Sequence, residues 1–228
     1  MTLIIDAIQK GDLSKVMELL SDPELPSSIA ARENEALRYA AHYGHLDVVK
    51  KLLEYPAVRN NITAYDNWAL RYAAHYGHLD VVNKLLEYPT VVDDIAAKKN
   101  AALGFAACNG HLAVVKILLE HSAVVNNIAV GDNHALRCAA EMGHLGVVNK
   151  LLEYPAVRNN IVAEDNEALR YAAQRGHLDV VTKLLEYPAV RNDIATKENY
   201  ALRRAARNGH HLVCYVIAGK CWGDIKNV

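Results

Sequence analysis

The chain has 228 residues, 52% of them apolar, and a formal net charge of −1, because 25 Lys and Arg face 26 Asp and Glu. This near-balance argues against a general binder of nucleic acid or anionic membrane, which would carry a strong basic excess. No apolar run approaches the roughly 18 residues that a membrane span needs. The start, MTLIIDAIQKGD, lacks the basic n-region of a signal peptide.

The cysteines give no sign of an oxidising compartment. Cys108, Cys138, Cys214 and Cys221 show neither a CxxC pair nor a disulfide framework. With six prolines and 12 glycines, the composition is typical of an ordered chain. We therefore expect a cytoplasmic protein.

A repeated unit begins near the N-terminus and continues to the C-terminal end. The stretch ALRYAAHYGHLDVV that begins at Ala36 begins again at Ala69, a step of 33 residues that is kept without insertion or deletion. One step back reaches Ile4 and Gly11, so residues 3–20 form a degenerate first repeat. We predict seven repeats in a single domain, with an N-terminal capping repeat over 1–33, five internal repeats over 34–200 and a C-terminal capping repeat over 201–228.

Each internal repeat predicts two helices and a short third helical turn. Asn34 precedes the first helix, and we expect it to be an N-cap whose side-chain oxygen accepts an otherwise unpaired N–H. The first helix has an apolar stripe from Leu37 and ends at Gly44, which is free to take a positive φ. A second stripe follows from Leu46, and Pro56 both ends that helix and begins the short turn.

A repeat of this length with the pattern AA..GHL.VV..LLE resembles the ankyrin repeat. The resemblance implies an all-α, ankyrin-like solenoid of stacked helix-turn-helix units. The chain departs from the family where T-P-L-H is replaced by stretches such as EALR. It also lacks the glycine after the second helix, and has Pro56, Pro89, Ser122, Pro155 and Pro188 there. These departures predict β-hairpin fingers that are weak or absent.

The histidine that follows each repeat glycine, such as His45 or His78, invites a metal or catalytic interpretation. Successive copies would lie about 10 Å apart in a stack, whereas zinc ligands meet on one ion at about 2.1 Å. We therefore expect these histidines to make structural hydrogen bonds at the turn between helices. We expect no metal site and no cofactor.

Five arginines occupy one register of the first helix, and an acidic residue stands five positions before each. We predict a structural charge ladder that links the inter-repeat loop to the helix, with an acidic ligand held by the arginines as the alternative. The repeat without the arginine, at Gly104, has Lys99 at the acidic position. The predicted ladder comprises Arg38, Arg71, Arg137, Arg170 and Arg203 with Glu33, Asp66, Asp132, Asp165 and Glu198.

Positions that change between repeats are those that we expect to bind a partner. By the ankyrin resemblance they lie on the concave face and the loop tips. Exposed aromatic residues are common hot spots, although these could instead only cover the edge of the core. The predicted partner-binding residues are His42, Tyr43, Tyr65, Trp68, His75, Tyr76, Asn109, Met142 and Arg175. We expect Tyr72 and Phe105 to pack between repeats instead.

The predicted function is a non-catalytic protein–protein interaction scaffold, a monomer that binds an unidentified protein partner and neither membrane nor nucleic acid. The near-identical repeats resemble expanded arrays of intracellular bacteria and large viruses, which implies an effector delivered into a host cell. One alternative is a nucleic-acid-binding solenoid that uses the arginine row. The other is an enzyme in which Cys108 or Cys138 pairs with a histidine, although no GxSxG, HExxH, P-loop or dinucleotide glycine motif appears.

Overall fold

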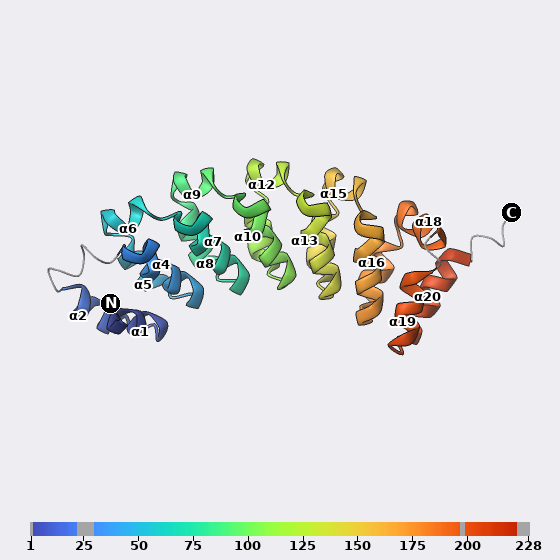
Figure 1. Ribbon diagram of the computed structural model, residues 1–228, viewed down its shortest axis with the longest axis horizontal. Coiled ribbons are helices and arrows are strands. Elements are labelled where there is room, and N and C mark those ends of the chain that lie inside the picture. The colour runs from blue at the N-terminus through green and yellow to red at the C-terminus, as the bar shows by residue number, and fades with distance from the viewer. Residues whose placement is uncertain (1, 22–29, 197–198, 223–228) are drawn as a thin grey trace. The chain divides into compact units, whose positions relative to one another are not determined.

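The computed structural model describes residues 2–21, 30–196 and 199–222, and these residues form helices joined by short turns (Figure 1). They contain no strand, which confirms the predicted all-α, ankyrin-like solenoid fold without hairpin fingers. The described part of the chain also has no helix long and apolar enough to cross a membrane.

Each repeat contributes a first helix and a second helix, and within the described residues five repeats add a short third helix. The first helices are α1 (Thr2–Gln9), α4 (Ala31–Tyr43), α7 (Ala64–Tyr76), α10 (Ala97–Cys108), α13 (Val130–Glu141), α16 (Ala163–Arg175) and α19 (Tyr200–Arg207). The second helices are α2 (Leu13–Leu20), α5 (Leu46–Leu52), α8 (Leu79–Leu86), α11 (Leu112–Leu118), α14 (Leu145–Leu151), α17 (Leu178–Leu184) and α20 (His211–Trp222). The third helices are α6 (Pro56–Asn60), α9 (Pro89–Asp93), α12 (Ser122–Asn126), α15 (Pro155–Asn159) and α18 (Pro188–Thr196).

The third helices confirm the predicted role of the repeat proline. Pro56 is the first residue of α6, where its missing N–H costs nothing because the first helical N–H groups have no partner within the helix. Val58 of the same short helix is fully buried, so the turn also contributes to the core.

The chain divides into two compact units, each a stack of helix pairs. The N-terminal unit comprises residues 1–106 and 113–127, and the C-terminal unit comprises residues 107–112 and 128–228. In the N-terminal unit α1, α4 and α7 pack in succession, and in the C-terminal unit α13, α16 and α19 do so. The paired alanines at these contacts, such as Ala40 and Ala41, are fully buried. Their small side chains allow successive first helices to approach closely.

The repeat histidines His45, His78, His144, His177 and His210 each join their repeat to the preceding one, which confirms their predicted structural role. Nε2–H of His78 donates to the carbonyl oxygen of His42 at 2.9 Å, and the ring of His78 lies directly against Gly44. Gly44 is the left-handed C-cap of α4, with a φ of 73°. A β-carbon at this glycine would overlap the imidazole, so the residue serves both the turn and the contact between repeats.

The repeat asparagine does not act as the predicted N-cap. Asn67 is the last of three successive left-handed residues inside α7, after Tyr65 and Asp66, with φ values of 56°, 55° and 61° in chain order. Its buried Nδ2 donates to the carbonyl oxygens of Val91 at 2.9 Å and Asp94 at 3.3 Å, whereas Oδ1 has no hydrogen-bond partner. The side chain therefore ties its helix to α9. The same bond to a carbonyl 24 residues later is made by Asn34, Asn100, Asn133 and Asn166.

Replacing Gly176 and Gly209 by alanine, one at a time, should show how much the close contact between glycine and histidine limits the stability of the substituted chain. Both have a left-handed backbone, with φ values of 80° and 75°, so each alanine costs about 1–2 kcal/mol. A β-carbon at Gly176 would also lie 2.6 Å from Nδ1 of His210, but nothing lies within 4 Å of it at Gly209. Overpacking should add about 1–3 kcal/mol at Gly176 alone.

Urea denaturation midpoints measure this difference. We expect a lower midpoint for Gly176→Ala than for Gly209→Ala, and a partial recovery when His210→Ala is combined with Gly176→Ala. Equal midpoints for the two glycine variants would show that the imidazole does not limit the approach of the repeats.

Asn133 provides a test of the buried amide. Its Nδ2 donates to the carbonyl oxygens of Val157 at 2.7 Å and Asn160 at 2.8 Å. Asn133→Ala should lower the free energy of unfolding by roughly 1–3 kcal/mol, because it leaves two carbonyl groups without their donor. Asn133→Asp, which keeps the shape but turns a carboxylate oxygen toward those carbonyls, should cost more. A higher urea denaturation midpoint for Asn133→Asp than for Asn133→Ala would contradict the role of Nδ2 as donor.

Candidate partner-binding site

Three variable positions come together where two successive repeats pack. One is the residue two positions before the repeat glycine. The other two lie on the first helix of the next repeat. Of these, one directly follows the repeat asparagine, and the other lies four residues after that position. In one such set the ring of His42 lies 6.2 Å from that of Trp68 and 5.6 Å from that of Tyr72, measured between centroids. Trp68 and Tyr72 stack on each other at 3.8 Å. We call each such set a junction triad.

The rings of the N-terminal unit form a continuous surface around this triad. His42 lies 4.5 Å from Tyr43 and 4.5 Å from Tyr76, and Tyr76 in turn lies 4.5 Å from His75. The contacts extend to Phe105 on α10, whose ring is 5.3 Å from that of His75. We call this surface the aromatic patch. It comprises His42, Tyr43, Trp68, Tyr72, His75, Tyr76 and Phe105 on α4, α7 and α10.

Two tyrosines of the aromatic patch are well exposed, whereas the rings around them are half-buried. Tyr43 is 42% exposed and Tyr76 is 45% exposed. Trp68 and Tyr72 are held by their mutual stacking. The patch thus presents ordered tyrosine rings on a supporting layer of other rings.

Arg38 connects Tyr65 to the edge of the patch. The guanidinium carbon of Arg38 lies 4.6 Å from the ring centroid of Tyr65 and 5.2 Å from that of Trp68. A guanidinium at this distance is attracted by the negative face of each ring. Tyr65 is 52% exposed, so its ring also remains accessible.

His42 is kept neutral by its place in the patch. Burial lowers the pKa of its imidazole below the ordinary value of 6.5, and the charges of His78 and His75 lower this pKa further. Nδ1 of His42 is buried without a hydrogen-bond partner, so a proton there would carry an unsatisfied charge. The lowered pKa therefore favours the neutral form of the His42 imidazole.

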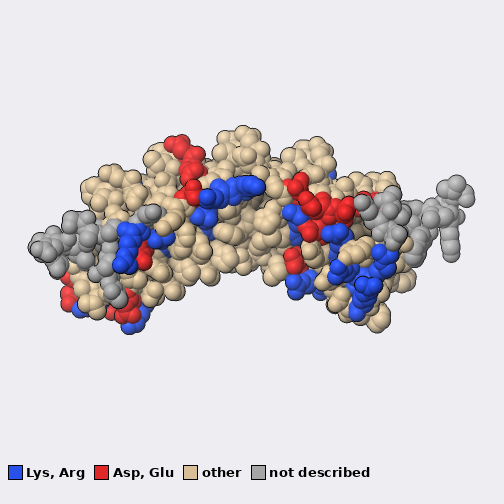
Figure 2. All heavy atoms as spheres, viewed as in Figure 1, with Lys and Arg blue, Asp and Glu red and all other residues tan. Residues whose placement is uncertain are grey.

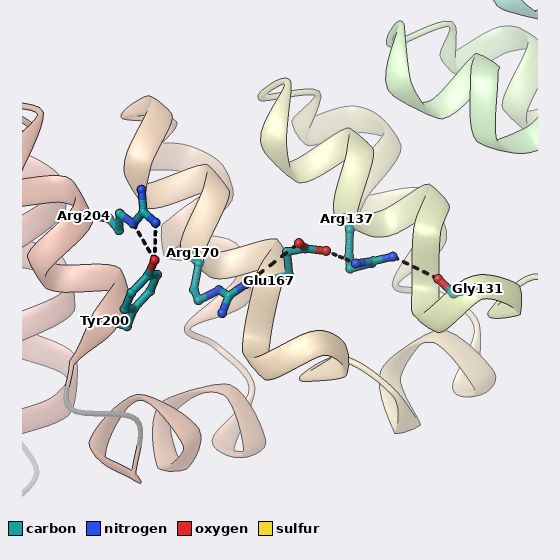
Figure 3. Close-up of polar contacts among 6 residues, drawn as sticks. All are labelled: Gly131, Arg137, Glu167, Arg170, Tyr200 and Arg204. Carbon is teal, nitrogen blue, oxygen red and sulfur yellow. Dashed lines mark hydrogen bonds and ion pairs between the residues drawn. The ribbon is translucent and has the colours of Figure 1, made fainter.

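The C-terminal unit uses the same registers for charged contacts (Figure 3). Arg137 pairs with Glu167 of the next repeat, and Arg170 lies 3.9 Å from the same carboxylate. Arg170 also lies 5.2 Å from the ring of Tyr200, whose hydroxyl accepts a hydrogen bond from Nε of Arg204 at 2.8 Å. The contacts of Arg137 with Glu167 and of Arg170 with Tyr200 link successive repeats, and the residues of this set form no aromatic surface comparable to the patch.

The structure brings most of the predicted partner-binding residues together. His42, Tyr43, Trp68, His75 and Tyr76 lie in the aromatic patch, and Tyr65 adjoins it through Arg38. The patch also contains Tyr72 and Phe105, which were expected only to pack between repeats. The sequence could have indicated that Tyr72 and Phe105 belong to the patch. Each lies four positions after a predicted variable position, Trp68 or Ala101, and therefore on the same face of its helix.

The remaining predicted residues lie in the C-terminal unit. Met142 is 53% exposed, and Asn109 is exposed as well. Arg175 donates to Glu141 at 2.9 Å, so its guanidinium makes an ion pair between repeats.

Three arginines of the predicted ladder link the loop to the helix through backbone carbonyl oxygens, and no ion pair with the carboxylate five positions earlier is seen for them in the described residues. Nε and Nη2 of Arg71 donate to the carbonyl oxygens of Asp66 at 2.9 Å and Tyr65 at 2.7 Å. The Asp66 carboxylate instead pairs with Lys98 at 3.0 Å. Arg38 and Arg137 likewise donate to the loop carbonyls of Arg32 and Gly131. Glu198 and the side chain of Glu33 lie outside the described residues.

Cys108 and Cys138 correct the expectation that the chain has no disulfide. Their sulfur atoms are bonded across a junction of the C-terminal unit, with Cα atoms 4.7 Å apart and a sequence separation of 30. His134 lies beside them, with Nε2 3.8 Å from Sγ of Cys138. These three residues are the junction triad that corresponds to His42, Trp68 and Tyr72.

His42→Gln should reduce the loss of stability at acid pH, since Gln174 occupies the same register in a later repeat. The lowered pKa means that the unfolded chain takes up a proton at His42 before the folded chain does, so stability present above 6.5 is lost as the pH falls. Melting temperatures at about pH 7.5 and about pH 5.5 measure this loss. Between these two pH values, we expect the melting temperature of His42→Gln to fall less than that of the unaltered chain. The same replacement at the exposed His211 is the control, and equal drops for the His42 variant and the unaltered chain would contradict the assignment.

Comparison with known proteins agrees with this architecture. A model of the family of ankyrin repeats in three copies matches residues 4–96 and 90–165. No curated protein matches the chain. The family match covers more than half of the residues, and the stacked helix pairs with their glycine-histidine turns are what such a match implies. The chain belongs to the ankyrin-repeat family.

Proposed function

We propose that the chain binds a partner protein through the aromatic patch of its N-terminal unit. Ankyrin repeats are generally protein–protein interaction modules. The observation that supports this surface in particular is that Tyr43 and Tyr76 are exposed while ring contacts hold them in place.

The order of the patch favours binding. Immobilising a flexible side chain at an interface costs about 0.5–1.5 kcal/mol. The rings of Trp68 and Tyr72 are already stacked, and His42 lies between Tyr43 and Tyr76. Little side-chain freedom is therefore left to lose when a partner docks, and tyrosine and tryptophan are enriched among interface hot spots.

The chemistry of the patch indicates which side chains of a partner it accepts. The rings offer apolar area and negative π faces, and the neutral His42 adds no charge. Apolar side chains and arginine suit such a surface.

We assign the patch to the concave face and Tyr65 to a loop tip, the positions that ankyrin repeats use. The resemblance of the near-identical repeats to expanded arrays of intracellular bacteria and large viruses supports a host protein as the partner.

The contacts of the arginines argue against the nucleic-acid alternative. The guanidinium groups of Arg38, Arg71 and Arg137 donate to loop carbonyls, and Arg137 also pairs with a carboxylate. Figure 2 shows Lys and Arg side chains beside Asp and Glu on the viewed face, with a basic area toward the last repeat. On this face the basic side chains are mixed with acidic ones over most of the elements, unlike the continuous basic stripe of a phosphate-binding surface.

Tyr43→Ala combined with Tyr76→Ala should weaken partner binding by at least about tenfold, because truncated hot spots cost roughly 2 kcal/mol or more each. The partner would first be enriched from a lysate with the unaltered chain and identified by mass spectrometry. Its dissociation constant for each variant would then be measured by calorimetry with purified proteins. We expect the double variant to keep the melting temperature of the unaltered chain, because both tyrosines are at least 42% exposed.

Tyr215→Ala is the matched control. Tyr215 lies on α20 in the C-terminal unit and is 78% exposed, so its truncation removes the same chemistry outside the patch. If both variants bind as tightly as the unaltered chain, the patch is not the docking surface. If only Tyr215→Ala weakens binding, the site lies at the C-terminal repeat.

A further inference from the structure

One junction triad has a composition that neither the fold nor partner docking explains. Cys108 at the end of α10 meets His134 and Cys138 on α13, and one ligand atom from each of the three residues lies within 4.8 Å of the other two. At the corresponding positions the N-terminal unit has His42, Trp68 and Tyr72, which make only ring contacts. Among the described residues this is the only cluster of histidine, cysteine and acidic side chains with the spacing of metal ligands.

The donors of this triad suit a soft transition metal. Thiolate sulfur and imidazole nitrogen are preferred by Zn²⁺ and Cu⁺, whereas Ca²⁺ and Mg²⁺ prefer oxygen. Zinc binds sulfur at about 2.3 Å and nitrogen at about 2.1 Å, which places two ligand atoms of a tetrahedral site roughly 3.6 Å apart. Nε2 of His134 and Sγ of Cys138 lie 3.8 Å apart. The helix turn between His134 and Cys138 therefore already holds two donors at a suitable separation.

The surroundings allow an ion to enter and be held. Cys108 and Cys138 are half-buried and His134 is exposed, so the cluster opens to solvent on the histidine side. The guanidinium of Arg137 is engaged by Glu167 and by the carbonyl oxygen of Gly131 (Figure 3).

The disulfide and a metal ion exclude each other at this junction. Two equivalents of a thiol reduce the Cys108–Cys138 bond: the S–S bond breaks, both sulfurs gain a proton and become thiols, and the two reductant thiols supply the two electrons and leave joined as a disulfide. An ion that binds these sulfurs displaces their protons to solvent, since the thiolate is the ligand. The sulfurs can then separate, because a bonded pair cannot serve as two thiolate ligands.

We propose that Cys108, His134 and Cys138, once reduced, form a three-ligand site for one Zn²⁺ ion, with the fourth coordination position open to solvent. This assignment replaces the expectation from sequence that the chain has no metal site. Zinc is known to bind a ligand set of two sulfurs and one nitrogen that leaves the fourth position open. The ion would bridge α10 and α13, the two elements that the disulfide joins when oxidised.

The test uses the full chain, reduced with a phosphine, freed of metal and titrated with Co²⁺ in the absence of oxygen. Co²⁺ replaces Zn²⁺ in such sites and absorbs through thiolate-to-cobalt charge transfer. We expect this absorption to saturate at one equivalent of Co²⁺, to disappear when Zn²⁺ is added, and to be missing in the oxidised chain.

Three variants locate the site. Cys138→Ser should remove the charge-transfer band, and circular dichroism would check that its helices are retained. His134→Ala changes an exposed side chain and should weaken Co²⁺ binding by at least about tenfold, since even outer-shell changes cost that much. Cys214→Ser replaces a free cysteine outside the cluster and should bind as the unaltered chain does.

Several results would overturn the proposal. A reduced chain without a charge-transfer band has no thiolate site. A band that persists in Cys138→Ser, or is lost in Cys214→Ser, would place the ligands elsewhere. Unchanged affinity in His134→Ala would exclude the imidazole and with it the three-ligand assignment.

Discussion

Within each compact unit, the contact between a repeat histidine and the preceding repeat fixes the step from one helix pair to the next. The imidazole of His78 lies against Gly44, and its Nε2–H donates to the carbonyl oxygen of His42. His144 makes the corresponding bond to Cys108 at 3.1 Å, and His177 makes it to Glu141 at 2.8 Å. In these three bonds the acceptor is the first member of a junction triad. One hydrogen bond therefore holds the backbone from which each triad is built.

A fixed backbone with variable side chains explains how one repeat serves several purposes. His42 with Trp68 and Tyr72 forms part of an aromatic surface, whereas Cys108 with His134 and Cys138 forms a disulfide with an imidazole beside it. In repeat proteins each unit contacts only its neighbours. A substitution in one triad thus changes the chemistry of one junction while the histidine bonds keep the same geometry elsewhere.

The sequence predicted those features that depend on periodicity within a repeat. The apolar stripes, the glycine at the helix end and the proline of the third helix follow from local rules, and the structure confirms them. The prediction that the repeat asparagine, such as Asn67, is an N-cap was wrong. A left-handed turn and an acceptor 24 residues away leave no local signal in the sequence. Cys108 and Cys138 were missed for a related reason. Their separation of 30 residues becomes a contact only after two repeats have stacked.

The cysteine junction keeps a cross-link in either redox state if the zinc site forms. The disulfide closes a loop of 30 residues, which constrains the unfolded chain and stabilises the fold by about 3 to 4 kcal/mol in the chain-entropy model. Reduction removes that constraint and at the same time creates two thiolate ligands. An ion shared by Cys108, His134 and Cys138 constrains the same helices, since a ligand that binds only the folded state stabilises it by mass action. The triad would then exchange one link between Cys108 and α13 for another, within the C-terminal unit.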